Sequence, residues 1–182
     1  HSHKPGAISI AQATEFGTVY TRAEIAAIGA LADANNMFLH MDGARFANAV
    51  ASLGCAPKEI TWQAGVDVLS FGGTKNGALA AEAVVFFDPA RDVAVRFGRK
   101  QAMQLPSKMR FVAAQFESLL RDGLWRRNAQ HANRMARRLA EGFSPEVQSE
   151  LLREAYRDAK QSRRTAPLGT PEAEAILSTS AG

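Results

Sequence analysis

Two short segments of the sequence end in residues whose chemistry is complementary. The segment 38–45 contains Asp42 and Arg45 around a glycine, and the segment 67–76 places Lys75 after two glycines and a threonine. Each begins as an apolar run typical of a strand, and parallel strands end along one edge of a sheet, where ligands bind. A lysine and an aspartate at that edge suit pyridoxal phosphate. The lysine amine forms a Schiff base with its aldehyde, and the aspartate keeps its pyridine nitrogen protonated.

Both residues also have structural interpretations, which stay open. Lys75 fits a surface lysine in a strand-to-loop turn, and Asp42 fits an N-cap for a helix that begins near Ala44. Two features favour chemistry at Lys75. Lysine is rarely buried without a purpose, and the glycines before it would let the backbone approach a ligand closely.

Two neighbours of Asp42 are further candidates. Arg45 lies at the start of the next helix, where a cation opposes the helix dipole. Binding a phenolic oxygen or a substrate carboxylate would account for it. His40 shares a strand face with Asp42, and a hydrogen-bonded core histidine is its favoured interpretation. No second histidine or carboxylate stands at a familiar ligand spacing and Cys55 is the single cysteine, so we expect no metal site.

The elements needed to position these residues follow from hydrophobic periodicity and start and stop signals. Thr21 and Glu24 form a capping box at the start of a helix, and Gly54 closes another. We expect strands and helices to alternate in an open, mostly parallel sheet, with long helices after it. The expected strands are 7–13, 37–42, 66–71 and 80–87, and the expected helices are 21–34, 46–53 and 107–143, the last with a break at Asp122-Gly123.

Composition limits the class of protein. The content of hydrophobic residues is 46% and that of charged residues is 22%, as in ordinary soluble globular proteins. No apolar run approaches the roughly 20 residues that span a bilayer, and the polar start 1–5 does not resemble a signal peptide. We therefore expect a cytoplasmic protein without a membrane partner.

The positive net charge of +4 is concentrated in 91–138. Because the few aromatic residues of this segment do not interleave with the arginines as a stacking platform would need, a solvated helix face is favoured over nucleic-acid binding.

The end of the chain has a different character. Ser144-Pro145-Glu146 predicts the start of a last helix. From Arg163 onward, small and polar residues with few large apolar ones predict a frayed or disordered end. We therefore divide the chain into a first domain, 1–143, and a divergent tail, 144–182.

The segments His40–Ala49 and Ser70–Gly77 together resemble low-specificity L-threonine aldolases, of the β-eliminating lyase family with the aspartate-aminotransferase fold. The segments 10–20 and 107–111 also fit, so the resemblance runs from residue 1 to about Phe143. It implies an α/β fold, namely a fragment of the large domain of a pyridoxal-phosphate enzyme. It further implies a homo-oligomer with shared active sites and a small β-hydroxy amino acid as substrate.

The resemblance also implies roles for individual residues. Lys75 would carry the cofactor, Asp42 would face its pyridine nitrogen, and Arg45 would lie beside the ring and the substrate carboxylate. Arg110 matches an arginine near the cofactor phosphate, contributed to a neighbouring subunit. His1 occupies the place of a histidine near the substrate hydroxyl. It, or a water that it orients, would take the β-hydroxyl proton during retro-aldol cleavage of L-threonine or L-allo-threonine to glycine and acetaldehyde.

The sequence departs from the family pattern in three respects. It contains no glycine-rich phosphate loop, no histidine that stacks on the cofactor ring, and no match to the small C-terminal domain. We therefore expect an incomplete chain with weak or no activity by itself. Two alternatives remain open: another β-eliminating lyase of the same fold, and a non-catalytic fragment that acts as an interaction module.

Overall fold

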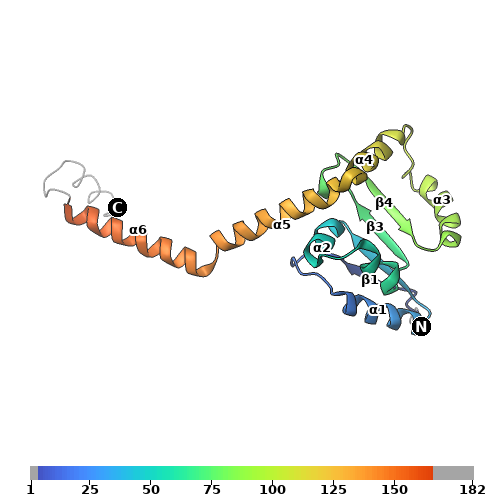
Figure 1. Ribbon diagram of the computed structural model, residues 1–182, viewed down its shortest axis with the longest axis horizontal. Coiled ribbons are helices and arrows are strands. Elements are labelled where there is room, and N and C mark those ends of the chain that lie inside the picture. Colours follow the sequence, from blue (N-terminus) through green and yellow to red (C-terminus); the bar gives the residue numbers. More distant parts are fainter. Residues whose placement is uncertain (1–3, 166–182) are drawn as a thin grey trace, which may run out of the picture. The chain divides into compact units, whose positions relative to one another are not determined.

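A computed structural model describes residues 4–165 of the chain, which form a small sheet and a series of helices (Figure 1). The strands are β1 (Ala7–Ala11), β2 (Phe38–Gly43), β3 (Val68–Gly72) and β4 (Glu82–Phe86). The helices are α1 (Arg22–Ala34), α2 (Phe46–Leu53), α3 (Asp92–Gln101), α4 (Arg110–Leu120), α5 (Leu124–Gly142) and α6 (Pro145–Thr165). Short 3-10 turns connect several of them, among them Thr74–Asn76, which begins two residues after the end of β3.

The sheet has the strand order β1-β2-β3-β4, and its first three strands are parallel. The expectation of a mostly parallel sheet is therefore confirmed. The fourth strand pairs antiparallel with β3, in a register that joins Gly72 to Glu82. The connection from Gly73 to Ala81 contains no crossover helix, and only an antiparallel neighbour can be reached by so short a return.

The predicted helix boundaries have the expected physical causes. Thr21 and Glu24 form a capping box at the start of α1, and Gly54 closes α2 in the left-handed conformation. The predicted break lies at Asp122, whose φ of 51° separates α4 from α5. The hydrogen bond from the Thr21 backbone N–H lowers the pKa of the Glu24 carboxyl. This contribution to stability is present above the ordinary carboxyl pKa and is lost as the pH falls through the lowered value.

The two faces of the sheet differ in burial. One face packs against α1 and α2, which lie on the same side of the sheet in Figure 1. It buries Leu39 and Met41 of β2 completely, together with Ile25 of α1 and Val50 of α2. The opposite face carries partly exposed residues, including Phe38 at the start of β2. Because strand side chains alternate between faces, the second face is also the one that bears His40 and Asp42.

The chain divides into two compact units, His1–Met135 and Ala136–Gly182. The second unit contains the end of α5 and the whole of α6, whose predicted start at Ser144-Pro145-Glu146 is confirmed. The predicted frayed end begins at Arg163, and most of it, 166–182, lies outside the described residues. None of the helices within 4–165 combines the length and the apolar character needed to cross a membrane.

Helix α1 approaches the turn Trp62–Ala64 closely at Gly29. A Cβ atom placed on Gly29 would lie 2.5 Å from the Ala64 carbonyl oxygen, inside van der Waals contact. Gly29 is buried there, whereas Leu31 is 56% exposed.

We expect Gly29→Ala to destabilise the fold by about 1–3 kcal/mol through overpacking, although alanine is the better helix former. Gly98→Ala is the matched control, because a Cβ on Gly98 of α3 meets no atom within 4 Å. That substitution should stabilise by up to about 1 kcal/mol. Urea unfolding of both variants measures the difference, and equal unfolding midpoints would contradict the close approach.

Candidate functional site

The structure brings Asp42 and the turn that carries Lys75 to one edge of the sheet. Asp42 is the register partner of Ser70, and Gly43 is the partner of Phe71. The turn Thr74–Asn76 begins two residues after β3 ends at Gly72. The two strands are parallel neighbours, so their carboxyl ends lie at the same edge, as the sequence predicts.

The Asp42 carboxylate is exposed and already accepts one hydrogen bond. Its Oδ1 accepts from the Ala44 backbone N–H at 2.9 Å, which fixes the side chain in a local turn. The N-cap of α2 is Arg45, which forms no side-chain cap bond, so the predicted capping role of Asp42 is wrong in its detail. Among residues 4–165, no hydrogen bond to Oδ2 is present. That oxygen faces no competing donor from the described part of the chain.

Lys75 is exposed, which corrects the argument that it is a buried lysine. The 3-10 turn carries its backbone beyond the end of β3, while the next residue, Asn76, is 7% exposed. Within the described residues, the Lys75 ammonium forms no hydrogen bond and no ion pair. It is therefore a flexible amine on an ordered turn.

The glycines before Lys75 serve the packing of the chain itself. A Cβ on Gly72 would lie 2.8 Å from the Ala44 backbone, and one on Gly73 would lie 2.8 Å from the Ala81 carbonyl oxygen. The expectation that these glycines also let the backbone approach a ligand stays a prediction, and the structure adds a contact within the protein. Their small size lets the segment after β3 lie directly against the segment after β2.

Arg45 pairs with a residue that sequence reasoning missed. Its guanidinium lies 3.2 Å from the carboxylate of Glu15, and the Arg45 side chain is half-buried whereas that of Glu15 is exposed. Glu15 belongs to a loop held by Gln12, which is completely buried and exchanges two hydrogen bonds of 3.0 Å with the Tyr20 backbone. The Gln12 backbone N–H also donates to the Asp42 carbonyl. Gln12 is a polar residue within the otherwise apolar predicted strand 7–13, and this was the sequence signal that could have indicated the loop.

His40 links the three parallel strands on the open face. Its Nδ1 is 2.8 Å from the Ser9 hydroxyl and its Nε2 is 2.9 Å from the Ser70 hydroxyl. The interpretation as a hydrogen-bonded histidine is confirmed, although the ring is half-buried and does not lie in the core. Ser70 is also the register partner of Asp42, so this bridge lies next to the candidate site.

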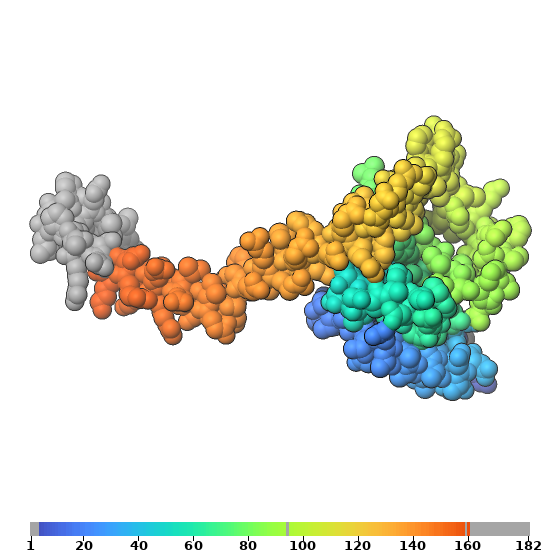
Figure 2. Space-filling view, in the orientation of Figure 1, coloured from blue at the N-terminus to red at the C-terminus, as the bar shows by residue number. Residues whose placement is uncertain are grey.

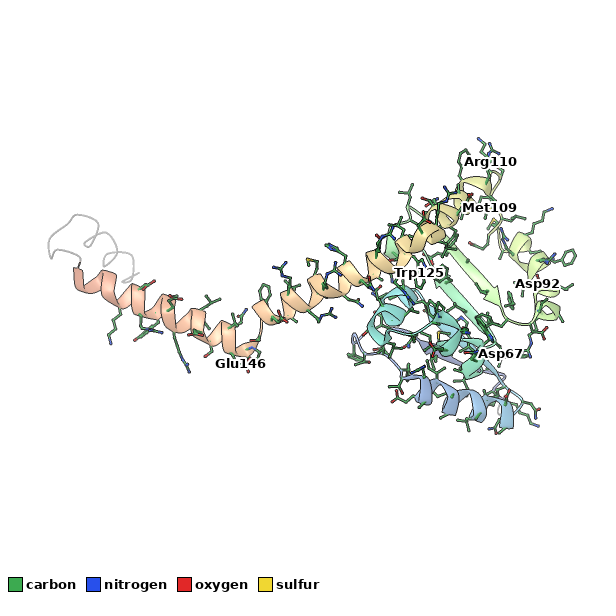
Figure 3. All side chains as sticks on the ribbon, viewed as in Figure 1. Asp67, Asp92, Met109, Arg110, Trp125 and Glu146 are labelled. Carbon is green, nitrogen blue, oxygen red and sulfur yellow. The ribbon has the colours of Figure 1, made fainter. Side chains whose placement is uncertain are left out.

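Neither of the other two predicted site residues is placed at this edge. Arg110 begins α4, as Figure 3 shows, and its guanidinium lies 4.8 Å from the ring of Phe111. Within residues 4–165 it forms no ion pair. His1 lies outside the described residues. Among those described, no cluster of three or more histidine, cysteine or acidic side chains could hold a metal ion.

The mostly parallel sheet with helices packed against it defines an α/β protein, and the solved structures that it resembles are threonine aldolases. A solved threonine aldolase from Leishmania major matches with a TM-score of 0.71 and 32% identity over 76% of this chain and 40% of its own. A structure described as a putative L-allo-threonine aldolase from Listeria monocytogenes matches with a TM-score of 0.63 over 75% of this chain and 38% of its own. At 18% identity it shows the fold alone.

The beta-eliminating lyase family matches residues 1–161, and the chain belongs to that family. A low specificity L-threonine aldolase of Pseudomonas aeruginosa is 55% identical over 143 residues, which are 78% of this chain and 41% of that protein. One from a Pseudomonas species is 51% identical over 140 residues, or 77% and 40%. The chain thus spans about two fifths of the length of the curated relatives it matches.

We expect Ser70→Ala to destabilise the protein by about 1 kcal/mol, because it leaves one nitrogen of the half-buried His40 ring without its partner. Ser52→Ala, on the exposed side of α2, is the control and should change stability by no more than about 0.5 kcal/mol. Chemical denaturation of the two variants provides the comparison. If the two variants have the same free energy of unfolding, the hydrogen bond between His40 and Ser70 contributes nothing to stability.

Proposed function

We propose that this chain carries the reactive centre of a pyridoxal-phosphate-dependent aldehyde-lyase. The reaction is the cleavage of L-threonine or L-allo-threonine to glycine and acetaldehyde. The observation that carries the proposal is the position of Lys75 and Asp42 at one sheet edge. The chain also belongs to the β-eliminating lyases and is 55% identical to a protein named as a threonine aldolase.

The donor set at this edge fits the cofactor. Lys75 offers an exposed amine, and Asp42 offers a carboxylate with one oxygen that accepts no hydrogen bond from the described residues. These are the two groups that an aldehyde and a pyridine nitrogen require. Pyridoxal phosphate, when bound, supplies a ring that accepts the electrons of a bond broken at the α-carbon of an amino acid.

Each residue of this chain then has a defined task. Lys75 binds the cofactor through its amine and holds it at the sheet edge. Asp42 keeps a proton on the pyridine nitrogen, because a carboxylate beside that nitrogen favours its charged form. Arg45, released from Glu15, binds the carboxylate of the amino acid substrate through charge-assisted hydrogen bonds. His1, or a water that it orients, takes the proton from the β-hydroxyl group.

The same proposal extends to assembly and location. Arg110 would contact the cofactor phosphate in the site of a neighbouring subunit, which requires a homo-oligomer with shared sites. We further propose a cytoplasmic protein, a cofactor-binding part in 1–143 and a separate tail in 144–182. A second candidate, another β-eliminating lyase that acts on a different β-substituted amino acid, is favoured by the family name itself.

Borohydride trapping tests the cofactor part of the proposal. We expect pyridoxal phosphate and borohydride to modify Lys75 faster than Lys58, an exposed lysine on the separate turn Pro57–Ile60, with peptide mass spectrometry as the readout. Before borohydride is added, the visible absorption of lysine-bound pyridoxal phosphate should be lost in Lys75→Ala and retained in Lys58→Ala. Equal modification of the two lysines would contradict a cofactor site at Lys75.

Product analysis separates the two lyase candidates. The aldolase proposal expects slow release of acetaldehyde and glycine from threonine or allo-threonine, above the background of Lys75→Ala. Cofactor trapping at Lys75 without acetaldehyde, together with a keto acid from another β-substituted amino acid, would replace the aldolase by the second candidate.

A further inference from the structure

The turn that carries Lys75 is held by neighbours on both sides of the lysine. Before it, the Gly73 backbone N–H donates to the Ala81 carbonyl at 2.9 Å, and the Ala81 N–H donates to the Thr74 hydroxyl at 3.1 Å. These bonds close the segment 73–81 into a loop. The lysine therefore projects from a backbone whose two ends are tied together.

The residue after Lys75 is bound from α5 by two amide hydrogen bonds. The Asn76 side chain donates from Nδ2 to the Trp125 carbonyl at 3.0 Å, and the Asn128 side chain donates from Nδ2 to the Asn76 carbonyl at 2.8 Å. Figure 3 labels Trp125 at the start of α5. We call these two bonds, together with their residues Asn76, Trp125 and Asn128, the amide clamp. The clamp fixes both the backbone and the side chain of the residue adjacent to the lysine.

The loop after the turn is fixed by α4. The Gln115 side chain accepts at Oε1 from the backbone N–H groups of Leu79 and Ala80, at 2.8 and 3.2 Å. Gly77 lies between the amide clamp and the residues bound by Gln115, and its φ is 113°. A Cβ atom on Gly77 would lie 2.9 Å from Asn128 Nδ2. Only glycine combines this backbone conformation with room for the Asn128 amide.

We infer that Asn128 is a positioning residue for Lys75, acting through the Asn76 carbonyl. This inference rests on the proposed function, since it concerns the reactivity of the lysine as a cofactor-binding amine. A lysine side chain is long and flexible, so its reactive position depends on where its backbone is anchored. Displacement of an anchor by about 1 Å can cost as much as 100-fold in reaction rate. Helix α5, distant from Lys75 in sequence, thereby sets the reactivity of the lysine.

The chain contains a matched control on the same helix. Asn133 of α5 pairs reciprocally with Asn48 of α2, with an amide-to-amide distance of 2.9 Å and an amide-to-carbonyl distance of 3.0 Å. Its side chain donates to a backbone carbonyl just as Asn128 does. It anchors α2 and not the lysine turn. A purely structural loss should therefore be similar at both positions.

The test compares Asn128→Asp with Asn133→Asp, since each removes one amide donor without changing side-chain size. The readout is the rate of pyridoxal phosphate trapping at Lys75 divided by the rate at Lys58 in the same sample. We expect Asn128→Asp to lower this ratio about tenfold or more. Asn133→Asp should leave it within about twofold while lowering the thermal midpoint comparably. Asn128→Ser, which removes the donor without adding a charge, serves if Asn128→Asp does not fold.

The outcomes separate this inference from the proposed function. An unchanged ratio in both Asn128 variants overturns the inference and leaves the cofactor site standing. Equal losses in Asn128→Asp and Asn133→Asp also overturn it, because the effect would then be one of general stability. A wild-type ratio of one overturns the proposed function, and the positioning role fails with it.

Discussion

The parallel pairing of β2 with β3 is the constraint on which the candidate site depends. Its register sets Asp42 beside Ser70 and brings the ends of both strands to one edge. A slip of one residue would turn Asp42 to the face packed by α1 and α2, because strand side chains alternate. Leu39 and Met41 prevent such a slip, since both would lose complete burial. The hydrophobic face of β2 therefore maintains the polar chemistry on its opposite face.

Ordered backbone and available functional groups coexist at this edge for a physical reason. Backbone groups and buried amides satisfy one another around the site, through Gln12 beside Tyr20 and through the amide clamp beside Lys75. Buried polar groups need such partners, and once satisfied they make a segment rigid. Asp42 and Lys75 stay exposed, and Arg45 is half-buried. Atoms of α2 lie against α5 in Figure 2, consistent with the Asn48–Asn133 pair.

Local signals predicted the parts of the structure that local physics determines. The capping box at Thr21, the close of α2 at Gly54 and the break at Asp122 were all readable, as was the parallel edge with Asp42 and Lys75. The antiparallel direction of β4 was not predicted, because an apolar strand does not encode its partner. The contacts of Glu15 and Asn128 join residues far apart in sequence, and no periodicity identifies such pairs. The exposure of Lys75 was not predicted either, because it is set by the 3-10 turn Thr74–Asn76 that follows β3.

The close approach of Gly72 and Gly73 to neighbouring backbone has a consequence for how mutational data on such proteins are interpreted. Side chains at these positions collide with the chain itself, at Ala44 and Ala81, whether or not a ligand is bound. Intolerance to substitution beside a reactive lysine is commonly attributed to contact with the cofactor. Here the same intolerance would arise in a protein that never bound one. Intolerance to substitution at these glycines therefore gives no measure by itself of what the site binds.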